Sequence, residues 1–277
     1  MINFNGTLES QQPEFTANRA FKYGDAVFET LKVVNGNILF LEDHYFRLMA
    51  SMRVMRMEIP MTFTMEFIEA EVLKLISELG LVQNAARVRM TVYRDSEGLY
   101  LPDSDNISYV IDAKKLLKSS YELNHSACEV DLFKDHYITP QLLSTLKTNN
   151  RVVNVIASIF AKENELDNCL LLNSDKKVVE AINGNVFLVK GTTIKTPPLT
   201  DGCIKGIMRM QLIKLISKME GFEVEEMSIS PFELQKADEI FITNVIQGVV
   251  SISKYRKKEF NTSVAEKLVR LLNTYLV

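Results

Sequence analysis

A lysine and a glutamate stand out as residues that can do chemistry together. Lys147 lies in the segment Ser-Thr-Leu-Lys-Thr-Asn-Asn-Arg, where a strand-like run gives way to a helical pattern, and Glu180 follows in Val-Val-Glu-Ala-Ile-Asn-Gly-Asn. A lysine at the mouth of a pocket can form a Schiff base with an aldehyde, and a later carboxylate can hold the proton of a pyridinium ring. The pair therefore suggests pyridoxal 5'-phosphate as a cofactor. Taken singly, Lys147 reads as an exposed lysine and Glu180 as a surface charge on an edge strand.

An anionic cofactor also needs donors for its phosphate, and the chain offers them at three places. These are the helix start at Gly206, Ile207 and Met208, the strand end at Thr243 and Asn244, and the helix arginine Arg47. Backbone N–H groups at a helix start and an arginine fork both suit phosphate oxygens. Each feature also has an ordinary explanation, as a turn glycine, a turn-capping asparagine or a surface arginine.

Length and composition set the outer limits of the interpretation. The 277 residues suffice for two domains, and the formal charge of -3 with interspersed acids and bases disfavours nucleic-acid binding. Cys128, Cys169 and Cys203 are far apart and odd in number, so neither a disulfide framework nor a metal site is expected. With no long apolar run and no leader-like start, we expect a cytoplasmic protein without membrane contact.

The elements that must position these residues divide into two groups. Residues 1–113 predict a small N-terminal α+β domain, which a polar linker over 114–122 joins to a large cofactor-binding domain over 123–277. In the small domain the patterns predict a hairpin at 26–40 around Asn35-Gly36, helices at 41–57 and 62–79, and strands at 87–94 and 107–113. In the large domain they predict strands at 127–133, 169–173, 178–182, 185–189, 193–196, 222–229 and 238–243. They also predict a helix that follows the Lys147 segment and ends at about residue 164, and helices at 204–219 and 262–276.

In their order along the chain these segments resemble the class IV aminotransferases, which are pyridoxal-phosphate enzymes of fold type IV. The resemblance rests on the runs 19–30, 41–48, 147–150, 179–187, 196–207 and 237–244. It implies an α+β fold with a small N-terminal α/β sandwich and a larger C-terminal pseudo-barrel domain. It also implies cofactor binding by Lys147, Glu180, Arg47, Asn150, Gly206, Ile207, Met208, Thr243 and Asn244.

The same resemblance narrows the activity without fixing it. Lys147 and Thr30 are expected to be catalytic, and Phe28, Arg89 and Arg94 to bind a small-molecule amino substrate. The form Lys-x-x-Asn-Arg and Thr30 favour a 4-amino-4-deoxychorismate lyase, which forms 4-aminobenzoate and pyruvate in folate biosynthesis. A branched-chain-type aminotransferase using 2-oxoglutarate is the alternative, because Arg89 falls on the strand arginine of those enzymes. The run Asp95-Ser-Glu-Gly lacks the arginine and histidine of the D-amino acid aminotransferases.

Two further expectations complete the sequence-based description. Family members form homodimers, and the loop 95–106 is the candidate to complete the active site of the neighbouring subunit. A catalytically silent binding protein on the same scaffold is a second alternative, which the retention of both Lys147 and Glu180 disfavours. His44 is expected at the surface or in an interface, without a catalytic role.

Overall fold

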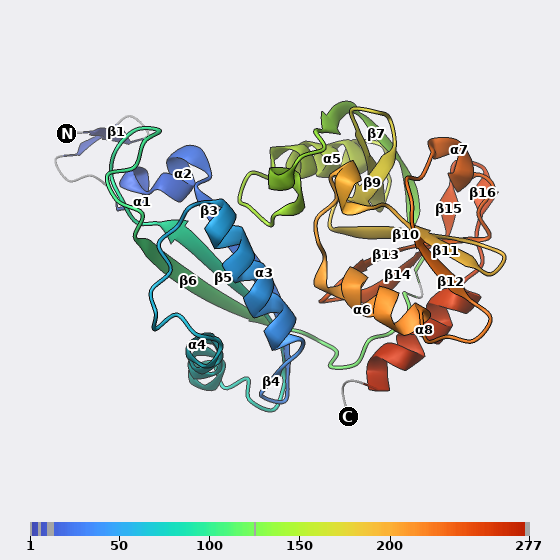
Figure 1. Cartoon of the computed structure of the whole chain (residues 1–277), viewed down its shortest axis with the longest axis horizontal. Helices are drawn as coiled ribbons and strands as arrows, with labels where there is room; N and C mark the ends of the chain where they lie inside the picture. The colour runs from blue at the N-terminus through green and yellow to red at the C-terminus, as the bar shows by residue number, and fades with distance from the viewer. Residues whose placement is uncertain (1, 5–6, 10–13, 125, 275–277) are drawn as a thin grey trace. The chain divides into compact units, whose positions relative to one another are not determined.

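A computed structural model describes residues 2–4, 7–9, 14–124 and 126–274 of the chain (Figure 1). The chain forms two compact units. The first takes in residues up to Lys115 together with the short segment Lys147–Asn150, and the second takes in Leu116–Leu146 and the chain from Arg151 onward. The domain limits predicted from the sequence stay a prediction.

A mixed set of helices and antiparallel strands makes up the first unit. Its main sheet has the order β4-β3-β5-β6, formed by β3 Ala26–Val34, β4 Asn37–Ile38, β5 Ala85–Arg94 and β6 Ile107–Lys115. Asn35 and Gly36, between β3 and β4, have φ values of 50° and 77°, which is the left-handed backbone that an Asn-Gly hairpin turn requires. The predicted hairpin is therefore confirmed.

One face of this sheet is apolar and packs against two helices, α3 Leu41–Val54 and α4 Met65–Glu78. Alternate residues of β3 and β5 point into this core, where Val27, Leu31 and Val88 meet helix side chains such as Met52. The intervening residues therefore point to the opposite face. Shorter elements precede the sheet, and they are β1 Ile2–Phe4, β2 Thr7–Glu9, α1 Glu14–Ala17 and α2 Arg19–Tyr23.

The ends of both core helices differ slightly from the sequence-based prediction. α3 ends at Val54 and not at residue 57, and α4 begins after Thr64, whose hydroxyl accepts a hydrogen bond from the backbone N–H of Phe67. Thr64 caps the helix, so the start predicted at residue 62 is two residues early.

A larger sheet organises the second unit. Its strand order is β12-β11-β10-β9-β8-β7-β15-β16, and β13 pairs with both β10 and β14. The strands are β7 Glu129–Ile138, β8 Asn168–Asn173, β9 Val178–Ala181, β10 Gly184–Lys190, β11 Thr193–Thr196, β12 Glu223–Glu226, β13 Glu239–Asn244, β14 Gly248–Ile252, β15 Lys254–Tyr255 and β16 Lys258–Glu259. β9 is an inner strand, so Glu180 on it is not on an edge.

Helices and short helical turns connect these strands. They are η1 Leu142–Thr145, α5 Val152–Glu163, η2 Leu199–Asp201, α6 Ile207–Ile216, α7 Pro231–Leu234 and α8 Ser263–Asn273. α5 packs Ala157 and Ala161 against Phe133 and Leu171 of β7 and β8. The predicted helix 204–219 is shorter at both ends, because residues 204–206 form a loop that other side chains hold.

The fold is thus the mixed α+β type that the sequence predicts. The predicted strands at 169–173, 178–182, 185–189 and 193–196 correspond to β8, β9, β10 and β11. β14, β15 and β16 were not predicted from the sequence. Among the residues that the structure describes, no helix is both long and apolar enough to span a bilayer.

Candidate active site

Lys147 is held in place by backbone pairing with the free edge of β3. The N–H of Phe28 donates to the carbonyl oxygen of Lys147 at 2.8 Å, and the N–H of Asn149 donates to Ala26 at 3.0 Å. Val27 and Thr148 form the bridge between these bonds. Because side chains alternate along an extended chain, Lys147 lies on the side of Phe28, with its Nζ 4.5 Å from the ring centroid.

Arg89 lies against the same phenyl ring. Its guanidinium carbon is 3.7 Å from the Phe28 centroid, and its Nε and Nη2 donate to Thr91 Oγ1 at 3.1 Å and Asn149 Oδ1 at 3.0 Å. Thr30 is directly opposite Arg89 in the β3–β5 register. Burial and then Arg87 lower the pKa of Arg89. The structure therefore brings together four of the predicted residues, Phe28, Thr30, Arg89 and Lys147.

On the helix-covered face of the same strand, Glu29 joins a buried charge cluster. Arg47 donates to it through Nε at 2.8 Å and Nη2 at 2.5 Å, and Glu29 Oε2 is 2.6 Å from His44 Nδ1. Burial raises the pKa of Glu29, but Arg47 and His44 outweigh burial and lower the pKa to about 2. Two nitrogens of Arg47, predicted to bind phosphate, thus hold this carboxylate.

His44 is a deeply buried residue, so its predicted place at the surface is wrong. Only 1% of the residue is exposed, because it faces the core from the first turns of α3. Burial lowers the pKa of the ring, although the hydrogen bond to Glu29 opposes this shift. Its Nε2 is buried without a hydrogen-bond partner among the described residues.

The remaining predicted residue on β5, Arg94, has a different environment from Arg89. Its Nε donates to Asp25 at 3.0 Å, its Nη1 pairs with Asp105 and with the carbonyl of Arg56, and its Nη2 donates to the Met55 carbonyl at 2.5 Å. All three guanidinium nitrogens of Arg94 therefore donate hydrogen bonds to groups of the first unit. This arrangement favours a structural role for Arg94 over the predicted substrate-binding role.

The second unit carries the glutamate. Glu180 on β9 is 3% exposed, and its Oε2 accepts the backbone N–H of Ile204 at 2.9 Å. Asn185 on the neighbouring β10 donates from Nδ2 to the Ile204 carbonyl at 2.9 Å. The loop before α6 is therefore held by side chains of two adjacent strands.

This loop ends at Gly206, which lies close against the Asn185 side chain. A Cβ at this position would lie 2.0 Å from Asn185 Oδ1, so a larger residue would displace the asparagine. Gly206 is the N-cap of α6 and leaves the backbone N–H groups of Ile207 and Met208 at the first turn of a ten-residue helix. The side chains of Ile207 and Met208 are buried. Their predicted contribution is thus through the backbone.

The other predicted polar residues hold the backbone around them. The Thr243 hydroxyl donates to the Gly248 carbonyl at 2.5 Å, and Asn244 Oδ1 accepts the N–H groups of Ile246 and Gln247. Asn150 Nδ2 donates to the Gly24 carbonyl at 3.3 Å. These contacts favour turn-capping and anchoring roles for the three side chains over direct cofactor binding.

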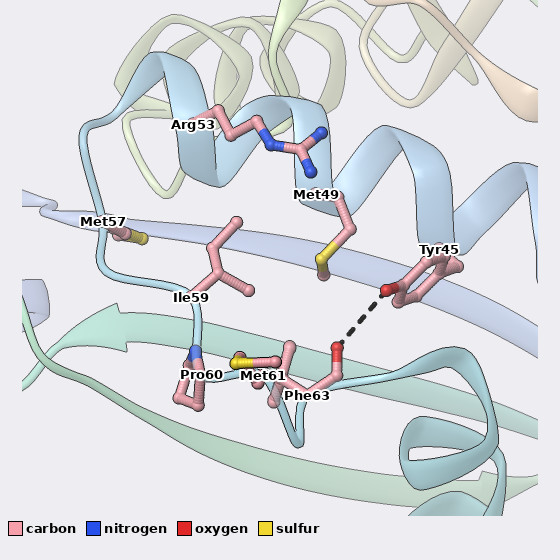
Figure 2. Close-up of a pocket in the computed structure, with 8 residues that line it drawn as sticks. All are labelled: Tyr45, Met49, Arg53, Met57, Ile59, Pro60, Met61 and Phe63. Carbon is pink, nitrogen blue, oxygen red and sulfur yellow. Dashed lines mark hydrogen bonds between the residues drawn. The ribbon is translucent and has the colours of Figure 1, made fainter.

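A pocket elsewhere in the first unit is separate from these residues (Figure 2). It has a volume of about 430 Å³ and is lined by Tyr45, Met49, Arg53, Met57, Ile59, Pro60, Met61 and Phe63. None of the predicted site residues lines it. In the described part of the chain there is also no group of histidine, cysteine and acidic side chains placed to hold a metal ion.

Comparison with known proteins decides the family. The sequence profile of the family "Amino-transferase class IV" matches residues 26–255. The chain belongs to the class IV aminotransferases. Enzymes of this family use pyridoxal 5'-phosphate, so this class IV aminotransferase-family protein is a pyridoxal-phosphate-dependent aminotransferase or lyase, and a silent binding protein is set aside.

Individual relatives carry different names. The class IV chain is 28% identical to a putative branched-chain-amino-acid aminotransferase of Methanocaldococcus jannaschii, over 90% of this chain and 85% of the relative. It is 26% identical to the aminodeoxychorismate lyase of Vibrio harveyi, over 91% and 90% of the two chains.

A solved structure confirms the fold. The branched-chain aminotransferase of the thermophilic archaeon Thermoproteus uzoniensis, solved with norvaline, matches with a TM-score of 0.83 at 23% identity, covering 98% of this chain and 92% of that one. The predicted fold type IV architecture is thereby confirmed.

The residues of this class IV protein fit the cofactor. Gly206 is the N-cap of α6 and lies close against the Asn185 side chain, and Glu180 is a buried carboxylate beside the loop that leads into the first turn of this helix. In the other unit Lys147 presents an amine over an aromatic ring. An anion site, a partner for a ring nitrogen and an amine are the groups that pyridoxal phosphate needs.

Three residues important to the site were missed from the sequence. Asn149 holds Arg89, Glu29 holds Arg47, and Asp25 joins Arg94 to Arg19. Glu29 interrupts the apolar alternation of Val27 and Leu31, and a charge on a core-facing position needs a partner. That interruption is the signal that could have found it.

We predict that Glu29→Gln lowers the free energy of unfolding by about 3 kcal/mol or more, because it leaves the Arg47 guanidinium without its buried counter-charge. Urea unfolding monitored at neutral pH measures the effect. Glu69→Gln, on the exposed side of α4, is the control and should change stability by less than about 0.5 kcal/mol.

The effect of Glu29→Gln on the free energy of unfolding should depend on pH. The pKa of Glu29 falls from 4.5 to about 2 on folding, so its stabilisation is complete above pH 4.5 and is lost as the pH falls toward 2. The stability difference between wild type and Glu29→Gln should therefore shrink below about pH 4. A difference that stays constant over this range would contradict a buried ion pair.

Proposed function

We propose that this protein is a 4-amino-4-deoxychorismate lyase, which converts its substrate to 4-aminobenzoate and pyruvate. The observation that carries the proposal is the placement of Thr30 opposite Arg89, on the sheet face where Lys147 and Arg89 share the Phe28 ring. The Thr30 hydroxyl, the Arg89 guanidinium and the Lys147 amine would then face the same substrate. The relative named aminodeoxychorismate lyase in Vibrio harveyi supports the same assignment.

In this proposal each predicted residue has a defined role toward the cofactor. Lys147 would hold the cofactor covalently, and its amine would move the proton at the substrate carbon that bears the amino group. Glu180 keeps the ring nitrogen protonated, while the backbone at Ile207 and Met208 and the Arg47 guanidinium bind the phosphate. The bound cofactor supplies an electron sink for the carbanion at that carbon.

Thr30 distinguishes the lyase from a transaminase in the proposed chemistry. Elimination of pyruvate needs a proton at the departing group, and we assign its relay to the Thr30 hydroxyl. Thr30 is directly opposite Arg89 in the strand register, so the two side chains lie on one face of the sheet. Arg89 is itself positioned by Thr91 and Asn149, so its guanidinium is preorganised.

A branched-chain-type aminotransferase is the second candidate. The relative in Methanocaldococcus jannaschii that carries such a name is 28% identical to this chain, and one in Thermotoga maritima is 30% identical over 85% of this chain. In that case the same Lys147 and Glu180 act with 2-oxoglutarate as amino acceptor, and Thr30 has no leaving group to protonate.

We also propose a homodimer in which the loop 95–106 reaches the active site of the neighbouring subunit. Leu99, Tyr100 and Leu101 are 78%, 89% and 83% exposed, and apolar side chains at a loop tip suit burial in a partner. The Arg19 guanidinium donates to the carbonyls of Leu99 at 2.6 Å and Tyr100 at 3.2 Å, which fixes the loop backbone.

A reducing cytoplasm is the proposed location, and folate biosynthesis the proposed pathway. Cys128, Cys169 and Cys203 are all free and buried, which suits a compartment where thiols stay reduced. The pathway follows from 4-aminobenzoate as product.

The lyase proposal is tested by incubating the cofactor-loaded protein with aminodeoxychorismate and following 4-aminobenzoate by fluorescence and pyruvate by a coupled assay. We expect both products in equal amounts, without a requirement for a 2-oxo acid. A parallel reaction with leucine and 2-oxoglutarate is the comparison. Turnover in the leucine reaction alone would assign the protein to the aminotransferases.

We predict that Lys147→Ala abolishes turnover and the visible absorption band that borohydride removes from the wild type, because no other amine replaces the covalent link. Lys162→Ala, an exposed position on α5, is the control and should keep both. A borohydride-sensitive band in Lys147→Ala would show that a different lysine carries the cofactor.

We predict that Glu180→Gln retains the cofactor but slows turnover on the order of 10²-fold or more, because a neutral amide does not keep the ring nitrogen protonated. The amide oxygen can still accept the Ile204 N–H, so the loop should be preserved. Glu223→Gln on exposed β12 is the control. Full activity in Glu180→Gln would remove this residue from the proposed role.

A further inference from the structure

The loop 95–106, between β5 and β6, is held by one buried arginine, Arg19 of α2. The Arg19 guanidinium donates to four successive backbone carbonyls. Nη1 donates to Glu97 and Gly98, both at 3.3 Å, and to Leu99 at 2.6 Å, and Nη2 donates to Tyr100 at 3.2 Å. Carbonyl oxygens that converge on one point repel one another unless a cation lies between them. Because Arg19 is only 3% exposed, water does not easily replace it in this role.

Asp25 fixes the other side of the Arg19 guanidinium. Its Oδ2 accepts a hydrogen bond from Arg19 Nε at 2.9 Å and another from Arg94 Nε at 3.0 Å. Arg94 is the last residue of β5, and its backbone N–H donates to the Asp25 carbonyl at 3.2 Å. The loop is thus tied to the sheet through Arg19, Asp25 and Arg94 in turn. A planar guanidinium that is bound at both ends has little freedom to turn away from the loop.

The loop backbone is itself shaped for this arrangement. Gly98 has a φ of 90°, and a Cβ at this position would lie 2.4 Å from the carbonyl oxygen of Leu101. A bridge pairs Gly98 with Pro102, and the N–H of Ser104 donates to Ser96 Oγ at 2.9 Å. The exchange of the Ser104 amide proton therefore reports whether the loop stays closed.

The tip of the loop exposes apolar side chains on this fixed backbone. Leu99, Tyr100 and Leu101 are among the most exposed large apolar residues of the described chain. A loop that is ordered before association loses less conformational entropy on binding than a loop that its partner must order. Ordered backbone and exposed apolar side chains together suit a contact surface that is formed before the partner arrives.

We infer that Arg19 is a positioning residue for the active site of the neighbouring subunit. It holds the backbone of residues 97–100, and in this way it sets where the loop 95–106 places its side chains in that site. The inference rests on the proposed homodimer, in which this loop reaches the neighbour. Arg19 acts through the loop and not through contact with the substrate or the cofactor.

The first test measures hydrogen–deuterium exchange of the loop 95–106 by mass spectrometry in the cofactor-loaded protein. We expect Arg19→Met to raise the exchange rate of the loop amides about 10-fold or more, because the four carbonyls lose their common donor. Lys22→Met is the matched control, since Lys22 is exposed on the same helix, and it should leave the rate unchanged. Equal exchange in wild type and Arg19→Met would show that Arg19 does not hold the loop.

Gly98→Ala disturbs the loop without touching the arginine. Its Cβ would displace the Leu101 carbonyl, so this variant should raise loop exchange as Arg19→Met does. Because Gly98 lies in a surface loop, the fold should be kept even if Arg19→Met unfolds. Wild-type exchange and wild-type kinetics in Gly98→Ala would contradict a role for the loop conformation.

The second test asks in which subunit Arg19 acts. With the substrate that the wild type converts, the Arg19→Met homodimer should raise KM about 10-fold or more and leave kcat within about 3-fold. In a mixed dimer of Arg19→Met with Lys147→Ala, the intact lysine lies in the Arg19→Met subunit and the intact loop in its partner. This mixed dimer should regain the wild-type KM. A KM that stays raised there would mean that Arg19 acts within its own subunit, and the inference fails.

These outcomes are separate from those of the lyase proposal. If the wild type converts leucine with 2-oxoglutarate and not aminodeoxychorismate, the lyase proposal fails, and rescue in the mixed dimer still supports the inference. If the wild type releases 4-aminobenzoate but sediments as a monomer in analytical ultracentrifugation, the lyase proposal stands and the inference fails together with the homodimer.

Discussion

The candidate site depends on the backbone pairing between the segment Lys147–Asn150 and the edge of β3. Two N–H···O=C bonds and one bridge are enough to fix which side of the strand each residue of the segment occupies. Lys147 then shares the face of Phe28 and Arg89, and Asn149 reaches the Arg89 guanidinium on that face. A shift of one residue would turn the lysine toward the helix-covered core, so register at this edge determines whether there is a site at all.

The strand β3 separates two electrostatic environments. On the core face, Glu29 accepts hydrogen bonds from Arg47 and is hydrogen-bonded to His44, so a carboxylate faces the Arg47 guanidinium there. On the other face, cations outnumber acids along the paired positions of β3, β5 and β6, where Lys32, Arg87, Arg89 and Lys114 meet Asp112. The core face of β3 therefore pairs a cation with a carboxylate, whereas cations prevail on the opposite face.

Sequence reasoning was strongest where a residue type has one chemical use and weakest where a polar side chain has several. Lys147, Glu180 and Gly206 were assigned to the cofactor because an amine, a carboxylate and a helix-opening glycine each match a need of the cofactor, and this assignment stays a prediction. Asn150, Thr243 and Asn244 were assigned to the cofactor, yet their side chains hold nearby backbone groups. Arg89 and Arg94 are five residues apart on β5, so strand alternation places their side chains on opposite faces of the sheet. The acidic side chains that bind Arg94 come from segments distant in the sequence, so the sequence did not indicate its environment. The hairpin and inner strands followed from local sequence patterns, whereas β15 and β16 have only two residues each, too few for a pattern, and β15 pairs with the distant β7.

The first unit is not a continuous stretch of chain. Four of its residues are supplied from within the sequence of the second unit, so the polypeptide passes between the units three times, after Lys115, Leu146 and Asn150. A fragment that stops at Lys115 would leave the backbone groups of Ala26 and Phe28 unpaired at an open strand edge, where another chain can add. Gene fission at this boundary would thus separate Lys147 from the strand that positions it, which constrains how such a protein can be split, permuted or recombined.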